Sequence, residues 1–72
     1  MKLFIFKTDI NTKQKVESMN DVLGRDNEII DVSIDLEDID NVLRVETTDF
    51  IEESDIVNRV HSKGFYCAEL AD

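Results

Sequence analysis

The stretch that decides the fold runs from residue 30 to residue 47 and reads IDVSIDLEDIDNVLRVET. Over residues 30–36 apolar and polar side chains alternate, which predicts a strand with one buried and one wet face. Acidic residues then dominate 37–41, which is typical of a turn. Alternation resumes over 42–47 and predicts a second strand, antiparallel to the first. The side chains predicted to face the core are Ile30, Val32, Ile34, Leu36, Leu43 and Val45.

Upstream of this hairpin the sequence predicts one strand and one helix. Residues 2–8 are dense in Leu, Ile and Phe and predict a strand. Residues 11–23 predict a helix, because apolar side chains recur there at steps of three and four. Either Asn11 or Thr12 can cap its start, and we expect Gly24 to end it in the left-handed conformation. In the strand, Phe4, Phe6 and Thr8 share one face, and Leu3, Ile5 and Lys7 share the other.

Downstream of the hairpin the pattern is again a helix followed by a strand. Residues 51–63 predict a helix, and Gly64 is placed to end it. Two starts are possible: Asp49 with Glu52 three residues later, or Glu52 with Asp55 three residues later. The sequence leaves both open. Residues 65–70 predict a short last strand. The buried face of this helix consists of Ile56, Val57 and Val60, with Ile51 at its edge.

The predicted element order is therefore β-α-β-β-α-β, with a strand, a helix and a strand in each half. The simplest fold for this order is an α+β, ferredoxin-like sandwich. It has a four-stranded antiparallel sheet with both helices on one face. We expect residues 1–72 to form a single domain, because a chain of 72 residues has room for one core only.

Composition excludes several classes of protein. The single cysteine, Cys67, rules out an intramolecular disulfide, and with the single histidine, His61, it cannot complete a four-ligand zinc site. No apolar run approaches the ~20 residues that span a bilayer. The apolar run near the N-terminus has four residues, which is too short for a signal peptide. We therefore expect a cytoplasmic protein without membrane insertion.

The charge distribution is strongly acidic and uneven. Eight basic and seventeen acidic residues give a net charge of -9, which disfavours binding to nucleic acid. Residues 1–25 carry five basic and three acidic side chains, whereas residues 26–72 carry three basic and fourteen acidic ones. The acidic run 26–40 is interleaved with apolar residues and predicts a solvated face; a surface for a basic partner is the alternative. It does not fit a calcium loop, which needs glycine at its sixth position.

Five segments, in this order and spacing, resemble the heavy-metal-associated (HMA) domain, the fold of small copper chaperones and of metal-binding domains of metal-pumping ATPases. They cover nearly the whole chain. Residues 4–8 resemble the first strand, Ile10 and Asn11 the approach to the first helix, and residues 30–47 the hairpin. Residues 62–65 resemble the end of the second helix, and residues 68–70 the last strand. The resemblance implies the same ferredoxin-like fold and a role in metal handling.

The metal motif of that family is absent. HMA domains bind Cu(I) through C-x-x-C in the loop that enters the first helix, and the resemblance places these two cysteines at Thr12 and Lys15. A hydroxyl is a hard, weak ligand, and an ammonium group has no free lone pair. Soft metal ions favour thiolates. We therefore do not transfer the family's metal site to these two positions.

Two other residues offer alternative ligands. Cys67 lies in the last predicted strand, and we expect it to be a small buried residue rather than a ligand. His61 lies at the end of the second predicted helix, where a cation suits the helix dipole, and we expect it at the surface. A non-standard metal site built on Cys67 or His61 remains the alternative.

Two surface regions are candidates for contacts with partners. Leu3, Ile5 and Val42 fall on the sheet face away from the helices, with Tyr66 as a further member, and either are scattered surface residues or form a dimer or partner interface. Lys13 and Lys15 make the start of the first helix basic. That helix start is either ordinary or a site for a small anion.

Nothing in the sequence predicts catalysis, since no nucleophile–histidine pairing and no phosphate-binding loop occurs. We expect a non-enzymatic, degenerate HMA-like domain that serves as an interaction or accessory module in metal handling, with no cofactor. The alternatives are a heavy-metal ion such as copper at a non-standard site and anion binding at the first helix. Expected partners are proteins, including a component of a metal-transport system, and the chain itself should be a monomer or weak homodimer.

Overall fold

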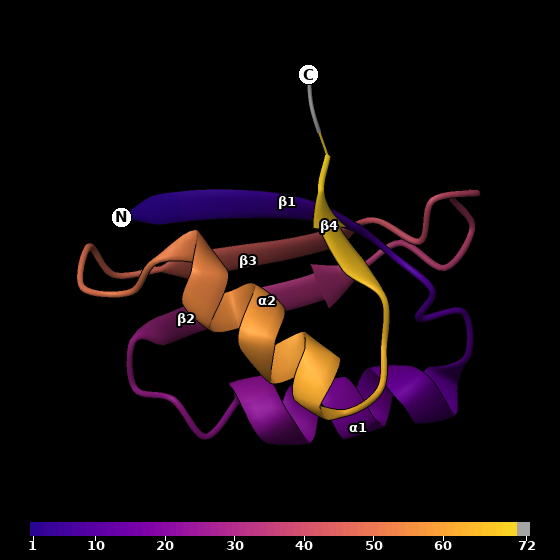
Figure 1. Cartoon of the computed structure of the whole chain (residues 1–72), viewed down its shortest axis with the longest axis horizontal. Helices are drawn as coiled ribbons and strands as arrows, with labels where there is room; N and C mark the ends of the chain where they lie inside the picture. Colours follow the sequence, from indigo (N-terminus) through magenta and orange to yellow (C-terminus); the bar gives the residue numbers. More distant parts are fainter. Residues whose placement is uncertain (71–72) are drawn as a thin grey trace.

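The six elements of the computed structural model follow one another in the predicted order, and the structure describes residues 1–70. Their bounds are β1 Lys2–Thr8, α1 Lys13–Leu23, β2 Ile29–Ile34, β3 Leu43–Thr47, α2 Glu53–Ser62 and β4 Cys67–Glu69. The strands form one antiparallel sheet in the order β2-β3-β1-β4, and both helices cover the same face of it (Figure 1). The ferredoxin-like α+β fold is therefore confirmed. Within residues 1–70, neither helix is long and apolar enough to cross a membrane.

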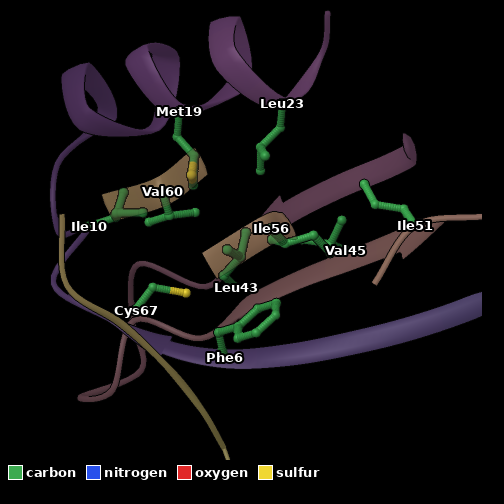
Figure 2. Packing of buried hydrophobic residues seen from close by; sticks show 10 residues of the cluster. All are labelled: Phe6, Ile10, Met19, Leu23, Leu43, Val45, Ile51, Ile56, Val60 and Cys67. Atoms are coloured by element: carbon green, nitrogen blue, oxygen red, sulfur yellow. The ribbon is translucent and has the colours of Figure 1, made fainter. Parts of the chain in front are cut away.

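The core lies between the sheet and the two helices; β1, β3 and β4 contribute buried side chains, and β2 contributes partly buried ones that pack against them. In β1, Phe6 is fully buried whereas Leu3 is 56% exposed, as the predicted faces require. Figure 2 shows the side chains of this core meeting between the layers. Its members are Phe6, Ile10, Met19, Leu23, Leu43, Val45, Ile51, Ile56, Val60 and Cys67.

The hairpin differs from its prediction at both ends of β2. Ile29 pairs with Thr47 and Asp31 pairs with Glu46, so Ile30 is an extra residue between them. Such a bulge shifts the alternation of the strand, which leaves Ile30 exposed and puts Ile29 against the core. Leu36 lies beyond the end of β2 and is exposed as well. The predicted inward orientation of Ile30 and Leu36 is wrong.

The start of α1 agrees with its prediction, but its end does not. Thr12 is the N-cap, and its hydroxyl accepts a hydrogen bond from the Lys15 amide at 3.2 Å. Gly24 has φ of -68°, so the expected left-handed conformation is wrong. Its amide donates to the Asn20 carbonyl at 2.7 Å, and a Cβ atom at Gly24 would come within 2.6 Å of that oxygen. Glycine therefore provides room at this helix end.

The second of the two predicted starts for α2 is the one observed. Glu52 is the N-cap, and its amide donates to the Asp55 carboxylate at 2.9 Å. Ile51 precedes the helix and is 3% exposed, because it packs into the core rather than at the helix edge. Gly64 follows the C-cap residue Lys63 and has φ of +85°, so the predicted end of α2 at Gly64 is confirmed.

The last strand is shorter than predicted. β4 pairs with β1 over three residues only, whereas β1 pairs with β3 over five. Phe65 and Tyr66 belong to the connection from α2. The Tyr66 amide donates to the Asp9 carboxylate at 2.8 Å, so this connection is fixed to the segment that follows β1.

Candidate functional site

The segment between β1 and α1 lies at one end of the sheet, where it meets the β2–β3 loop (Figure 1). The Thr8 hydroxyl donates to the Asn41 carbonyl at 2.7 Å and accepts from the Ile10 amide at 3.2 Å. The Thr8 amide donates to the Asp40 carbonyl at 3.0 Å. Because Thr8 and Ile10 are also buried, this segment approaches α1 along a fixed path.

The two positions that the sequence resemblance matches to C-x-x-C make local hydrogen bonds at the start of α1. Thr12 caps α1 through the Lys15 amide. The Lys15 ammonium group donates to the Asn11 side-chain oxygen at 3.0 Å. The start of α1 therefore presents a hydroxyl and a cation at the two positions where the resemblance implies cysteines.

This set of donors does not fit a soft metal ion. Cu(I) favours thiolate and thioether ligands, and the ammonium group adds electrostatic repulsion. Across residues 1–70, no group of three or more His, Cys, Asp or Glu side chains is arranged to hold a metal ion. The loop geometry thus offers helix capping and local hydrogen bonding rather than metal coordination.

Cys67 lies on β4 and points into the core beside Phe6 and Leu43 (Figure 2). It is 4% exposed, so its predicted burial is confirmed. Burial, with a smaller contribution from the Glu53 carboxylate, raises the pKa of the Cys67 thiol to about 11. The thiol is therefore protonated at neutral pH, and a protonated thiol is a poor ligand.

His61 lies in the last turn of α2 and is exposed, as predicted. Its Nε2 atom lies 3.2 Å from the backbone carbonyl oxygen of Cys67, rather than facing the thiol. The His61 ring is therefore close to the backbone of Cys67 in β4. A metal site built on either of them remains a prediction.

One of the residues predicted to form an exposed apolar surface is buried. Leu3 is exposed and Ile5 is half-buried, but Val42 is only 4% exposed. Val42 precedes β3 and lies outside the core cluster. Tyr66 is exposed on the connection from α2 to β4. An interface at this face would therefore involve Leu3 and Ile5 without Val42.

Lys13 is exposed at the first position of α1, and Lys15 is half-buried two residues later in the same turn. The first turn of α1 holds no acidic residue, so this helix start is basic, as the sequence indicates. Anion binding here remains a prediction, as does a role for Lys13 and Lys15 in contacting a partner.

Two carboxyl groups that the sequence pattern did not single out lie together at another edge of the molecule. Glu53 begins α2, and Glu69 ends β4. Desolvation and then the neighbouring Glu69 carboxylate raise the pKa of Glu53. Sixteen positions separate the two residues, so no local motif could have indicated this pairing.

An ion pair lies near the C-terminal ends of the two helices. Asp26, in the α1–β2 loop, is paired with Arg59 in the last turn of α2. The Glu28 amide, which donates to the Asp26 carboxylate at 2.8 Å, is the main cause that lowers the pKa of Asp26, and Arg59 lowers it further against the opposing effect of burial.

The chain has the fold of a heavy-metal-associated domain, as its sequence resemblance implied. One similar solved structure is a copper-binding domain from HMA7, a P-type ATPase, with a TM-score of 0.83 and 20% identity over 99% of this chain and 96% of that one. Another is the CsoZ metallochaperone, with a TM-score of 0.78 and 16% identity over 93% and 96% of the two chains. No protein-family model and no curated protein matches the sequence. At these identities the likeness concerns the fold.

Proposed function

We propose that this chain is a degenerate HMA-like domain that acts through its surface as an interaction or accessory module in metal handling. The observation that carries the proposal is the pair Thr12 and Lys15 at the family's ligand positions, with both groups engaged in hydrogen bonds. The link to metal handling rests on the fold, since the similar structures are a copper-binding domain and a metallochaperone.

The charge of Lys15 makes the proposal specific. A missing thiolate would only weaken a metal site, but an ammonium group at that position repels an approaching cation. Its hydrogen bond to Asn11 keeps this charge beside the loop. Restoring metal binding would therefore require removal of the charge as well as addition of the two thiols.

The partner in this proposal is a protein, for instance a component of a metal-transport system. The start of α1, with Lys13 and Lys15, presents positive charge on a molecule whose net charge is -9, which suits a partner with acidic groups. Leu3 and Ile5 supply the other candidate surface, including the one for a weak homodimer.

The decisive experiment compares Cu(I) binding of the natural chain with that of the variant T12C/K15C. Binding is measured anaerobically against a chromogenic Cu(I) chelator, and T12S/K15S serves as the matched control that removes the charge without adding thiols. We expect the double-cysteine variant to bind with a Kd below about 1 µM, equivalent to more than ~8 kcal/mol, and the other two chains to show no competition.

Two results would count against the proposal. Submicromolar Cu(I) binding by the natural chain, with NMR shifts confined to residues 10–16, would contradict it directly. Binding by the natural chain that disappears in C67S would transfer the metal site to Cys67 instead, and the buried, protonated thiol of this residue speaks against that outcome.

A further inference from the structure

One edge of the sheet is formed by β2, which pairs with β3 on one side only (Figure 1). No segment within residues 1–70 pairs with the other side of β2. β4 lies at the opposite edge of the sheet, about 14 Å away. Residues 71 and 72 extend at most about 7 Å beyond Leu70, so the edge at β2 is out of their reach. This edge is therefore open because of the strand order itself.

The backbone groups of Val32 and Ile34 point out of this open edge. The Asp35 amide donates to the Val42 carbonyl at 3.0 Å, in the register of the β2–β3 pair. Because hydrogen-bonding directions alternate along an antiparallel strand, Ser33 faces β3, whereas Val32 and Ile34 turn their amides and carbonyls away from it. Within residues 1–70 no hydrogen bond from another segment reaches these groups. They are available to an added strand.

A shallow groove of about 300 Å³ runs beside this edge, between β2 and the end of α1. Residues 29–32 line one side of the groove, and Asn20 and Gly24 line the other. Ile30, the extra residue of the bulge, is 51% exposed there. The face of β2 that carries Val32 is the one that packs toward the helices. A side chain paired with Val32 on an added strand would therefore enter the groove.

The face of β2 that points away from the helices is acidic. Asp31 lies directly opposite Glu46 of β3, and like charges in such a cross-strand pair are destabilising. Neither carboxylate forms a salt bridge within residues 1–70, and Arg44, opposite Ser33, pairs with neither of them. Asp35 adds a further exposed acid two positions beyond Ser33. A positive charge over Asp31 would relieve the repulsion between the two carboxylates.

We propose that this edge binds an extended segment of a partner protein in which apolar and basic residues alternate. The segment pairs antiparallel with β2, which is the more stable arrangement. Its apolar side chain opposite Val32 enters the groove, and a basic side chain lies over Asp31 and Glu46. Strand addition of this kind derives its affinity from backbone hydrogen bonds and its specificity from alternate side chains. Arginine fits better than lysine, because its planar group can bond two carboxylates at once.

The charge of the edge favours a basic partner over a second copy of this chain. A second copy paired through β2 would bring another Asp31 and another Glu46 to the same face. It would also join two chains that each carry a net charge of -9. A segment with basic residues at alternate positions meets the same backbone groups and neutralises the face.

This inference goes beyond the proposed function, since the edge at β2 uses none of the residues at the start of α1. It can fail while the proposed absence of a Cu(I) site stands, and the converse is equally true.

The test uses the synthetic peptide acetyl-Thr-Arg-Val-Thr-Val-Arg-Thr-amide and the full chain labelled with ¹⁵N. In antiparallel pairing its valines lie opposite Val32 and Ile34, and its arginines lie over the acidic face. We expect chemical-shift changes along β2 and at the end of α1, with slower amide hydrogen exchange at Val32 and Ile34. The affinity should fall as salt is added.

Three altered peptides test the backbone bonds and the charge separately. N-methylation of both valines should abolish binding, because these amides donate to β2. N-methylation of the central threonine should be tolerated, because its amide points away from β2. Norleucine in place of both arginines should weaken binding about ten-fold, equivalent to ~1.4 kcal/mol.

The matched variants of the chain are D31N/E46Q and E53Q/E69Q, each of which removes two negative charges. Only D31N/E46Q should weaken binding, by about ten-fold, because Glu53 and Glu69 lie together at the opposite edge of the sheet. Circular dichroism melts verify that both variants fold.

Several results would overturn the inference: no shift at millimolar peptide, shifts located away from β2, full binding of the peptide with methylated valines, full binding of the norleucine peptide, or equal losses in both double variants. Concentration-dependent shifts at β2 without peptide would assign the edge to a second copy of this chain and would also overturn it.

Discussion

The two helices occupy equivalent places in the two halves of the fold, yet they begin with opposite electrostatics. Each is anchored by two fully buried side chains, Met19 and Leu23 in α1 and Ile56 and Val60 in α2. Since α1 and α2 pack on the same face of the sheet, their anchoring is alike (Figure 1). The difference between them lies at their ends.

The charges of α2 follow the helix dipole, and those of α1 do not. α2 has Glu53 and Asp55 in its first turn and Arg59 and His61 in its last. α1 has no acid in its first turn and no base in its last, and Lys15 stands in the first turn. α1 therefore depends on the Thr12 cap and on packing.

The largest effects should come from the shared anchors. Met19→Ala and Ile56→Ala should each lower the free energy of unfolding by about 2–5 kcal/mol, because each leaves a cavity in the core. Urea denaturation measures both. The half-buried Val16 is the control, and Val16→Ala should have a smaller effect. Losses that differed widely between the two anchors would show that the two helices are not equivalently packed.

The next largest effect should come from loss of the N-cap of α1. Thr12→Ala should cost about 1 kcal/mol, because the Lys15 amide loses its acceptor, while Thr12→Ser should retain most of the stability. Asp55→Ala provides the corresponding change in α2. If Thr12→Ala left the free energy of unfolding unchanged in chemical denaturation while Asp55→Ala lowered it, the result would contradict the dependence of α1 on its cap.

The Asp26 carboxyl group, which accepts from the Glu28 amide and pairs with Arg59, should give a pH-dependent effect. The pKa of Asp26 is lowered below its ordinary value of 3.8 in the folded chain. A depressed carboxyl pKa stabilises the fold above the unfolded value, and this stability is lost as the pH falls through the folded value. Asp26→Asn should therefore lower Tm at pH 7, and the difference from the natural chain should shrink below pH 3.8. A difference that persisted unchanged at pH 2 would be incompatible with this linkage.

The smallest effect should come from making the two helix starts alike. Lys15→Glu places an acid three residues after the Thr12 cap, which creates a capping box and suits the dipole. We expect a gain of about 0.5 kcal/mol. Lys15→Met is the control that removes the charge without adding an acceptor. Equal stabilities of the Glu and Met variants would show that only the loss of positive charge matters.

Local patterns in the sequence were sufficient for the order of elements and for several of their ends. The apolar faces of β1 and α1 follow from periods of two and of three to four, and Gly64 ends α2 as predicted because only the local chain decides that conformation. The exposure of Ile30 and the right-handed conformation of Gly24 could not be predicted from local patterns. The bulge depends on how β2 meets β3, and the need for glycine at position 24 depends on the distance to the Asn20 carbonyl.

The same distinction applies to the candidate site: part of it follows from the local sequence and part only from packing. The sequence by itself placed Thr12 and Lys15 at the positions that the resemblance assigns to the two thiols and predicted a buried Cys67 in the last strand, because residue chemistry and strand pattern are local properties. Only the tertiary structure decided that Val42 is buried and that Glu53 and Glu69 line one groove. These contacts join segments far apart in the chain, so packing rather than pattern brings them together.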